Sequence, residues 1–399
     1  MNLFNSLGSN YSRNFVTEAL ISRGTEKDSL QLVDYLNKKY QGESTLVYKG
    51  RDALRLGLEL LKLPQDSYVA VTGFTCYAVY KTICDANLIP LLLDIESESL
   101  NFTSDSLQKA INNKYKIKVV IIQNTLGIPC QIDNIKKVCQ ENKIYLVEDL
   151  AHCIGAKYAD ETECGSVGDM SILSFSQDKV VDGVSGGALV IRNKNITNRQ
   201  LSLAQISYNQ QLKDRIYPLL TYIIRNTYSL FGIGKIMHYT IKKLDLLSNP
   251  MELKTSNKIH KLPCLNSKLV NLQFNELNQY QKHRKSIADI YTNLILKEFL
   301  WTSTIVQINN SSNLRFAIFT ENRESLIKYL KNNHIHISDT WYDAPIAPKN
   351  YIKKTNYKGE CPNAEKAAKT ILNLPTHINI SKTDAENIAF KINQWKNTQ

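Results

Sequence analysis

The feature that most constrains the fold of this chain is a regular alternation of short β-branched runs with helical stretches between residues 45 and 192. Seven runs have the composition of strands: residues 45–48, 68–72, 89–94, 118–123, 144–148, 171–175 and 188–192. Helical patterns separate the first five runs, at residues 51–61, 78–86, 104–113 and 132–142. Alternating strands and helices pair in parallel through right-handed crossovers, and strands that are apolar on both sides are covered by helices on both faces. The alternation therefore predicts an α/β domain with a mostly parallel central sheet.

The rest of the chain predicts further regions around this sheet. A length of 399 residues exceeds what one core can organise, so we expect two domains. Residues 1–44 have a polar, helical pattern typical of an N-terminal arm, and the large domain extends over residues 45–250. Residues 251–399 predict a smaller C-terminal α/β domain, because a long helical pattern there is followed by another strand and further helices.

Within the large domain, an insert at about residues 198–247 is helical, basic and aromatic. Pro218 should kink or divide its helix, and the glycines around Gly232 should break it again. Between residues 211 and 245, basic residues and tyrosines flank an apolar stripe at helical spacing: Ile216, Leu219, Leu220, Ile223 and Ile224. The stripe predicts either a helix packed on the large domain or across a dimer, or a helix lying on a membrane surface near lipid-linked glycan assembly.

Composition narrows the classes of function. Apolar residues make up 43% of the chain and charged residues 22%, as in ordinary folded soluble proteins. No apolar run approaches the ~20 residues of a spanning helix, and the first residues lack a secretory signal. The eight cysteines form no C-x-x-C pair and no zinc-like cluster with histidine, so we expect neither disulfides nor a metal site. We therefore expect a cytoplasmic protein, at most peripheral at the inner face of the membrane.

The formal net charge is +12 at pH 7. Lysines and arginines are spread along the chain without a basic block, which indicates a solvated basic surface and no nucleic-acid partner. If the charge has a functional role, a phosphorylated substrate explains it most economically.

The first candidate site segment is Gly50-Arg51-Asp52, where a predicted strand ends and a helix begins. Ligands of open α/β sheets bind at the carboxyl ends of the strands. The free N–H groups and the dipole at a helix start suit a phosphate. A glycine at such a position more often marks only a turn. This segment therefore indicates a phosphate site only in combination with the two segments described next.

Two further segments follow predicted strands. Asp149 ends a buried strand, where a carboxylate is costly unless paired; it either caps a loop or faces a cationic ring nitrogen. His152 is either a core histidine or a ring that touches a cofactor. Lys179 follows the next strand, where desolvation favours the neutral amine that forms Schiff bases, although any single lysine is more often a surface residue.

Together these segments match the needs of pyridoxal 5'-phosphate (PLP). This cofactor requires a Schiff-base lysine, an acidic partner for its pyridinium nitrogen and a cradle for its phosphate. Lys179, Asp149 and the turn at Gly50 supply one of each. The sequence therefore predicts a PLP enzyme.

Three segments in a fixed order carry a family resemblance. They are E-D-L-A-H-C-I-G-A at residues 148–156, G-S-V-G-D at residues 165–169 and S-F-S-Q-D-K at residues 174–179. With these segments the chain resembles the DegT/DnrJ/StrS family of sugar aminotransferases, which are PLP enzymes of fold type I. The resemblance runs from about residue 47 to residue 378.

The resemblance implies a role for each matching residue. Lys179 forms the Schiff base with PLP, and Asp149 faces the pyridine nitrogen. His152 lies near the ring hydroxyl, and Ser174 contacts the phosphate together with the turn at Gly50. Some relatives carry histidine in place of the lysine and are dehydratases, so Lys179 favours transamination.

The chain departs from the family pattern at several positions. Arg51, followed by Asp52, stands where the family has threonine at the phosphate turn. Cys76 stands where an aromatic residue commonly stacks on the cofactor ring, which makes Tyr77 the next candidate for that contact. The segment that reaches the neighbouring subunit's site aligns poorly around residues 262–264.

The resemblance implies transfer of an amino group from an amino acid, with glutamate expected, to a nucleotide-linked keto-sugar for polysaccharide or glycan biosynthesis. It also implies a homodimer with sites at the subunit interface. Two alternatives stay open: a sugar dehydratase or an aminotransferase of a non-sugar ketone, and a non-catalytic regulator or membrane-associated scaffold.

Overall fold

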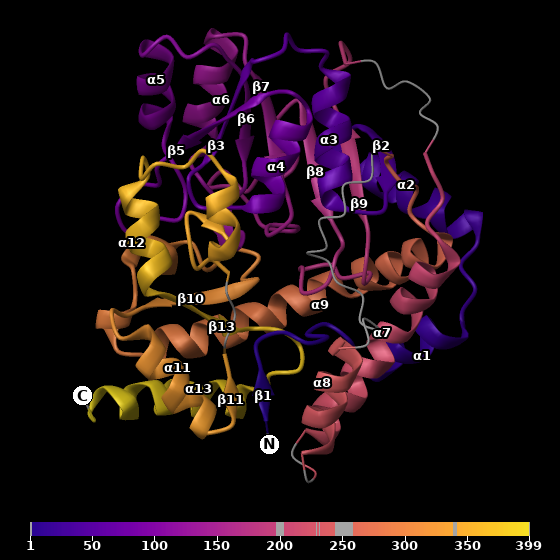
Figure 1. Ribbon diagram of the computed structural model, residues 1–399, viewed down its shortest axis with the longest axis vertical. Coiled ribbons are helices and arrows are strands. Elements are labelled where there is room, and N and C mark those ends of the chain that lie inside the picture. Colours follow the sequence, from indigo (N-terminus) through magenta and orange to yellow (C-terminus); the bar gives the residue numbers. More distant parts are fainter. Residues whose placement is uncertain are drawn as a thin grey trace.

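The computed structural model describes residues 2–196, 203–228, 230, 232–243, 258–337 and 341–398. Its centre is a seven-stranded sheet in the order β2-β9-β8-β7-β6-β3-β5 (Figure 1). The strands are β2 (Glu43–Val47), β3 (Tyr68–Thr72), β5 (Ile89–Leu93), β6 (Ile117–Ile122), β7 (Tyr145–Asp149), β8 (Met170–Ser174) and β9 (Gly187–Ile191). Every strand end lies within two residues of its predicted position.

The direction of the strands follows from their connections. Strands β8, β7, β6, β3 and β5 pair in parallel, which confirms the prediction of a mostly parallel sheet. Strand β9 runs antiparallel to both of its neighbours, β8 and β2. The loop of residues 175–186 joins β8 to β9 without a crossover helix, and a strand that returns directly runs antiparallel.

Helices cover both faces of the sheet (Figure 1). Helices α3 (Gly50–Leu60) and α4 (Tyr77–Asp85) share one apolar core with alternate strand residues such as Val69 and Val71. On the opposite face, Ala70 joins a second core with α2 (Glu26–Tyr40), α5 (Ser104–Asn112) and α6 (Ile132–Glu141). This alternation along single strands confirms that the sheet is buried on both sides.

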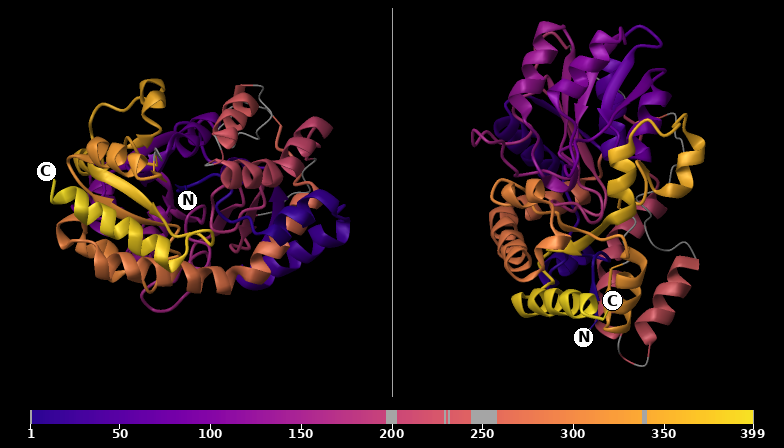
Figure 2. Two further views of the ribbon diagram at one scale, coloured as in Figure 1. Left: turned by 90° about the horizontal axis from the view of Figure 1, so that it is seen from below. Right: turned by 90° about the vertical axis from the view of Figure 1, so that its left-hand side faces the viewer.

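A second α/β assembly follows in the C-terminal part of the chain. Strands β10 (Arg315–Phe319) and β13 (Ile371–Pro375) pair antiparallel, with α11 (Arg323–Asn332), α12 (Pro362–Thr370) and α13 (Lys382–Lys396) around them. The long helix α9 (Cys264–Leu294) contributes Phe274 to a core of the large sheet and Ile287 to the core of this assembly. Figure 2 shows α9 extending from beside α2 to beside α13. The boundary predicted near residue 250 lies outside the described residues.

The N-terminal arm is helical as predicted, with α1 (Arg13–Ile21) and α2, but its first residues have a separate role. Strand β1 (Leu3–Phe4) pairs in parallel with β11 (Ile335–His336) of the C-terminal assembly. Residues 5–12 then run from there to the loop between β8 and β9.

The structure corrects the prediction for the insert. Its first described helix, α7, begins at Tyr208 (Tyr208–Thr227), because Ala204 forms a β-bridge with His260 instead. Pro218 lies inside α7 and does not divide it. The break expected around Gly232 does separate α7 from α8 (Ile233–Lys243).

The apolar stripe of α7 packs on the protein. Ile224 is fully buried and the other four stripe residues are partly buried, with Leu219 against the core formed by α1. The burial of Ile224 and the packing of Leu219 favour the packing interpretation for this part of α7. Among the described residues, no helix is both long and apolar enough to cross a membrane.

Candidate active site

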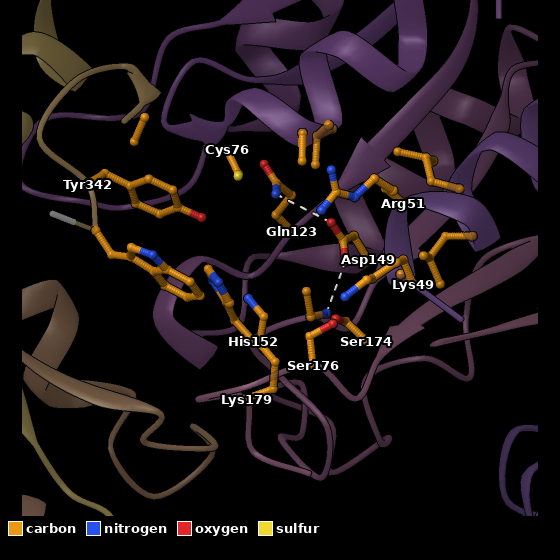
Figure 3. Close-up of a pocket in the computed structure, with 18 of the residues that line it drawn as sticks. Lys49, Arg51, Cys76, Gln123, Asp149, His152, Ser174, Ser176, Lys179 and Tyr342 are labelled. Atoms are coloured by element: carbon orange, nitrogen blue, oxygen red, sulfur yellow. Dashed lines mark hydrogen bonds between the residues drawn. The ribbon is translucent and has the colours of Figure 1, made fainter. Parts of the chain in front are cut away.

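A pocket opens where several strands of the large sheet end (Figure 3). Strand β2 leads to Lys49, Gly50 and Arg51; β6 leads to Gln123; β7 ends in Asp149; β8 ends in Ser174. Parallel strands bring these residues together because their carboxyl ends meet at one edge of the sheet. The far wall comes from the C-terminal part, with Trp341, Tyr342, Ala347 and Pro348.

Lys179 reaches the pocket from the loop between β8 and β9. Figure 3 shows its side chain beside His152, facing the same space as Asp149. Burial lowers the pKa of the Lys179 amine from 10.5 to about 8, with Cys76 and Asp149 opposing the shift. The amine nitrogen lies 4.0 Å from the centre of the Trp341 ring. A much larger share of this amine is neutral, and therefore nucleophilic, near neutral pH than for a surface lysine.

Asp149 is a buried carboxylate with few hydrogen bonds. Its Oδ1 accepts from the backbone N–H of Ala151 at 3.0 Å, and its Oδ2 lies 3.4 Å from the Gln123 amide nitrogen. Burial raises the pKa of Asp149. The side-chain oxygen of Gln123 is also buried and has no partner among the described residues. Asp149 and Gln123 therefore have unused acceptor capacity, which fits a bound group that carries a positive charge and hydrogen-bond donors.

His152 is held as a neutral ring. Its Nδ1 accepts from the backbone N–H of Leu126 at 3.2 Å, which leaves Nε2 as the donor. Burial, with a smaller effect of the Lys179 charge, lowers the pKa of His152 well below 6.5. Its ring centre lies 5.3 Å from that of Trp341 and 6.0 Å from that of Tyr342.

The turn at Gly50 is built by close backbone contacts. A Cβ atom on Gly50 would lie 2.8 Å from the Ser174 Cβ, and one on Gly187 would lie 2.7 Å from the Gly50 nitrogen. Only glycines let the start of α3 approach Ser174 this closely. The first N–H groups of α3, the Ser174 hydroxyl, Lys49 and Arg51 therefore gather at one end of the pocket.

Six of the predicted site residues line this pocket: Gly50, Arg51, Asp149, His152, Ser174 and Lys179. The other two, Asp52 and Tyr77, are not among its lining residues. The expectation that Tyr77 covers the cofactor ring gains no support from this geometry and stays a prediction. Tyr77 begins α4 and its ring stacks on Tyr351 at 4.7 Å, whereas Cys76 lines the pocket.

Several lining residues were not predicted as site residues. Gln123 directly follows a buried strand, so the rule that selected Asp149 would also have selected it. Trp341 has no such local signal. Near Trp341, β12 (Ile346–Ala347) pairs in parallel with β4 (Thr75–Cys76) and holds this part of the chain at the pocket. The two strands are far apart in the sequence, so no local pattern indicates their contact.

The residues present fit PLP on this geometry. Lys179 matches the reactive carbon of that cofactor, and Asp149 with the neighbouring Gln123 matches its ring nitrogen. The turn at Gly50 matches its phosphate. Among the described residues, no cluster of His, Cys, Asp and Glu could hold a metal ion.

Comparison with known proteins extends over nearly the whole chain. The model of the DegT/DnrJ/EryC1/StrS aminotransferase family matches residues 19–393. The GDP-perosamine synthase of Vibrio cholerae is 26% identical over 332 residues, which cover 82% of this chain and 79% of that protein. The dTDP-4-dehydro-2,3,6-trideoxy-D-glucose 4-aminotransferase of Saccharopolyspora spinosa is 24% identical, covering 85% and 81%.

Solved structures share the fold. Spr1654 from Streptococcus pneumoniae in its PLP form matches with a TM-score of 0.72 and 18% identity, covering 100% of this chain and 99% of that chain. Helicobacter pylori PseC, an aminotransferase involved in the biosynthesis of pseudoaminic acid, matches with a TM-score of 0.73 and 16% identity over the full length of both chains.

Proposed function

The chain belongs to the DegT/DnrJ/EryC1/StrS aminotransferase family, and from this premise we propose that it moves an amino group from glutamate to the ketone of a nucleotide-linked sugar. It is a PLP-dependent aminotransferase. The observation that carries the proposal is the single pocket in which the Lys179 amine and the Asp149 carboxylate meet the cradle at Gly50.

Each part of the cofactor has a place among these residues. Lys179 would bind it covalently, Asp149 would face its ring nitrogen, and Gly50 with Ser174 would hold its phosphate. Lys49 and Arg51 add positive charge at the phosphate end. When bound, PLP supplies an electron sink for the charge left after the Cα proton of an amino acid is removed.

The chain itself supplies proton transfer and a dry environment. The Lys179 amine, with a pKa of about 8, can take the Cα proton and return it to a neighbouring carbon as general base and acid. The Trp341 ring at 4.0 Å favours the ammonium form that this step creates. Asp149 stabilises positive charge on the ring nitrogen, and Trp341 and Tyr342 exclude water from that side.

The similar proteins and the net charge of the chain both support a nucleotide-linked sugar as the amino acceptor. Two relatives are named for GDP-perosamine and for a dTDP-linked keto-sugar. A net charge of +12 suits a diphosphate-linked substrate. The product would be an amino sugar for a polysaccharide or another glycan.

The first test is an absorbance spectrum of the purified, PLP-loaded protein. We expect a visible band that glutamate removes and that Lys179→Ala lacks. GDP- and dTDP-linked 4-keto-sugars should then restore the band and gain an amine, as measured by product mass. A protein that forms no band with PLP would overturn the proposal.

The same measurements separate the alternatives. A dehydratase would release a product that has lost water and gained no amine. An enzyme for a non-sugar ketone would respond to glutamate but to no nucleotide sugar. A scaffold would keep its biological activity in Lys179→Ala.

We further propose a homodimer, which rests on the family resemblance. Sedimentation equilibrium of the holoenzyme should give twice the mass of the 45.5 kDa chain. A monomeric holoenzyme with full activity would contradict this assembly.

Finally, we propose that α8 lies on an anionic membrane surface. Ile236 and Tyr239 are 66% and 69% exposed on α8, next to the exposed Lys235 and Lys243. Between residues 208 and 243 the only acidic residue is Asp214, which is buried and bonded to Tyr48. An apolar face with lysines suits anionic lipid, whereas an isologous contact of two such faces would bring like charges together.

Flotation with vesicles tests this proposal. The holoenzyme should float with vesicles that contain phosphatidylglycerol and stay behind with neutral ones, and Ile236→Glu should abolish flotation. Phe390→Glu, at a residue 61% exposed on α13, is the matched control and should float normally. Failure of the wild type to float would reject the membrane contact.

A further inference from the structure

The loop that carries Lys179 contains two strained residues. Asp178 and Val184 have φ angles of 61° and 68°, in the left-handed region that side chains other than glycine rarely adopt. A β-branched valine there is especially unfavourable. Such a loop keeps one conformation only if the surroundings determine it fully.

Asp182 braces both strained residues from within the loop. Its Oδ2 accepts from the backbone N–H of Asp178 and its Oδ1 from that of Val184, each at 2.8 Å. Asp182 is fully buried. Its third donor is the hydroxyl of Tyr11, also at 2.8 Å, which comes from the N-terminal segment.

Three consecutive residues of that segment contact the loop. Besides Tyr11, the Ser9 hydroxyl donates to the Asp178 carboxylate at 2.9 Å. Between them, the Asn10 amide donates to the backbone carbonyl of Lys179 at 2.5 Å. The N-terminal segment thus contacts the backbone of the lysine and the residues that brace it.

The segment is itself rigidly held. The guanidinium of Arg284 on α9 donates to the Asn10 side-chain oxygen at 2.6 Å, and Arg284 is fully buried. Gln273 donates to the Asn10 carbonyl at 3.3 Å, and Arg225 on α7 donates to the Gly8 carbonyl at 2.8 Å. The position of Lys179 is therefore tied through Asn10 to α9, and through the nearby Gly8 to α7.

We infer that Asn10 and Tyr11 are positioning residues for Lys179, so that the N-terminal segment is part of the catalytic apparatus. They act on the lysine through its backbone carbonyl and through Asp182, and they do not line the pocket. The inference rests on the proposed role of Lys179 in binding PLP. The new claim is that PLP binding by Lys179 also depends on residues near the start of the sequence.

Asn10→Asp separates positioning from mere stability. The aspartate keeps the oxygen that accepts from Arg284 but loses the donor to the Lys179 carbonyl. We expect a lower unfolding midpoint of the cofactor-free protein, because a carboxylate oxygen would face the Lys179 carbonyl, so capture of PLP is measured below this midpoint and per folded protein. We also expect the rate at which Lys179 captures added PLP, followed as absorbance, to fall roughly 10- to 100-fold.

The matched control is Asn393→Asp. Asn393 also donates its amide to a backbone carbonyl, that of Leu294, and accepts from the Leu296 N–H, but it lies on α13. It should capture PLP at the wild-type rate. Tyr11→Phe provides a second variant in case Asn10→Asp does not fold, since it removes only the donor to Asp182.

The outcomes distinguish the two claims. Borohydride reduction and mass spectrometry should locate PLP on Lys179 in the wild type; if they do not, the proposed function fails. If the wild type is labelled there and both Asn10→Asp and Tyr11→Phe capture PLP as fast as Asn393→Asp, the positioning role is wrong. If both variants capture PLP more slowly only in proportion to the fraction of protein that is unfolded, the segment has a purely structural role and the inference is also wrong.

Discussion

At the scale of single residues, two adjacent carboxylates on β7 have different environments. Glu148 is fully buried and accepts from the backbone N–H groups of Gly165, Val167 and Gly168 at 2.6–2.7 Å. It also pairs with Arg192 at 3.2 Å. Asp149 faces the pocket instead, because successive residues of a strand point to opposite faces. One acid therefore stabilises the fold and the other remains available to a ligand.

These environments predict opposite effects of two isosteric changes. Asp149→Asn should fold normally and bind PLP but lower the rate of amine transfer from glutamate by roughly 10²- to 10³-fold, because it removes the charge that faces the ring nitrogen. Glu148→Gln should cost about 3–5 kcal/mol of unfolding free energy, because it breaks a buried ion pair. Stopped-flow absorbance and urea unfolding measure the two effects. An unstable Asp149→Asn with normal rates would contradict this assignment.

The pKa of Lys179 predicts a cost in stability. The folded value of about 8 lies below the 10.5 of an ordinary lysine, so the unfolded chain binds more protons between these values. Stability of the cofactor-free protein should therefore rise with pH across this window. Near pH 7, Lys179→Met should be more stable than the wild type by about 1–2 kcal/mol, a figure reduced because the residue as a whole is only partly buried. Urea unfolding at pH 7 and pH 10 should show this difference shrink as pH rises.

At the scale of elements, the phosphate end of the pocket depends on how closely α3 approaches β8 and β9. Gly50 and Gly187 permit this approach, and Ser174 fills the remaining space. The helix then presents its first N–H groups and its dipole to the pocket. The backbone of α3 therefore contributes to this end of the pocket together with the side chains of Arg51 and Ser174.

Gly50→Ala should weaken PLP binding. Its Cβ would lie 2.8 Å from the Ser174 Cβ, and overpacking of about 1–3 kcal/mol corresponds to roughly a 10- to 100-fold loss of affinity. Spectroscopic titration of the cofactor-free protein measures it. Gly57→Ala, on the same helix but facing the flexible sulfur of Met170, is the control and should bind PLP normally. Equal affinities in both variants would argue against a phosphate site at this turn.

At the scale of the whole molecule, the pocket requires both halves of the chain. The large sheet supplies Lys179 and Asp149, while the segment after β11 supplies Trp341 and Tyr342. The short β12–β4 pairing joins the two parts beside the pocket, where Cys76 and Ala347 are lining residues. Burial of the Lys179 amine is therefore a product of tertiary assembly.

Trp341→Ala should raise the pKa of Lys179 toward its ordinary value. Burial is the largest cause of the lowered pKa of Lys179. The Trp341 ring also stabilises the ammonium form by ~0.5–1 kcal/mol, and we expect the loss of burial to outweigh the loss of this contact. The pH midpoint for capture of PLP should move upward, with Trp341→Phe in between. A midpoint that stays in place or falls would show that Trp341 does not shield the amine.

The sequence by itself determined where the central strands lie along the chain, because buried parallel strands carry apolar β-branched residues that helices regularly separate. It did not determine their order in the sheet or the reversed direction of β9. It also selected Lys179, Asp149, His152, Ser174 and the turn at Gly50, because each directly follows a strand or belongs to a recognisable segment.

Only the tertiary structure decided which side chains surround them. It turned Tyr77 onto Tyr351, brought Trp341 over Lys179, and joined Asn10 to the lysine's backbone. These contacts connect residues far apart in sequence, and their geometry depends on how two cores pack around α9. Local patterns report which face of an element is buried, but they do not report which distant element buries it.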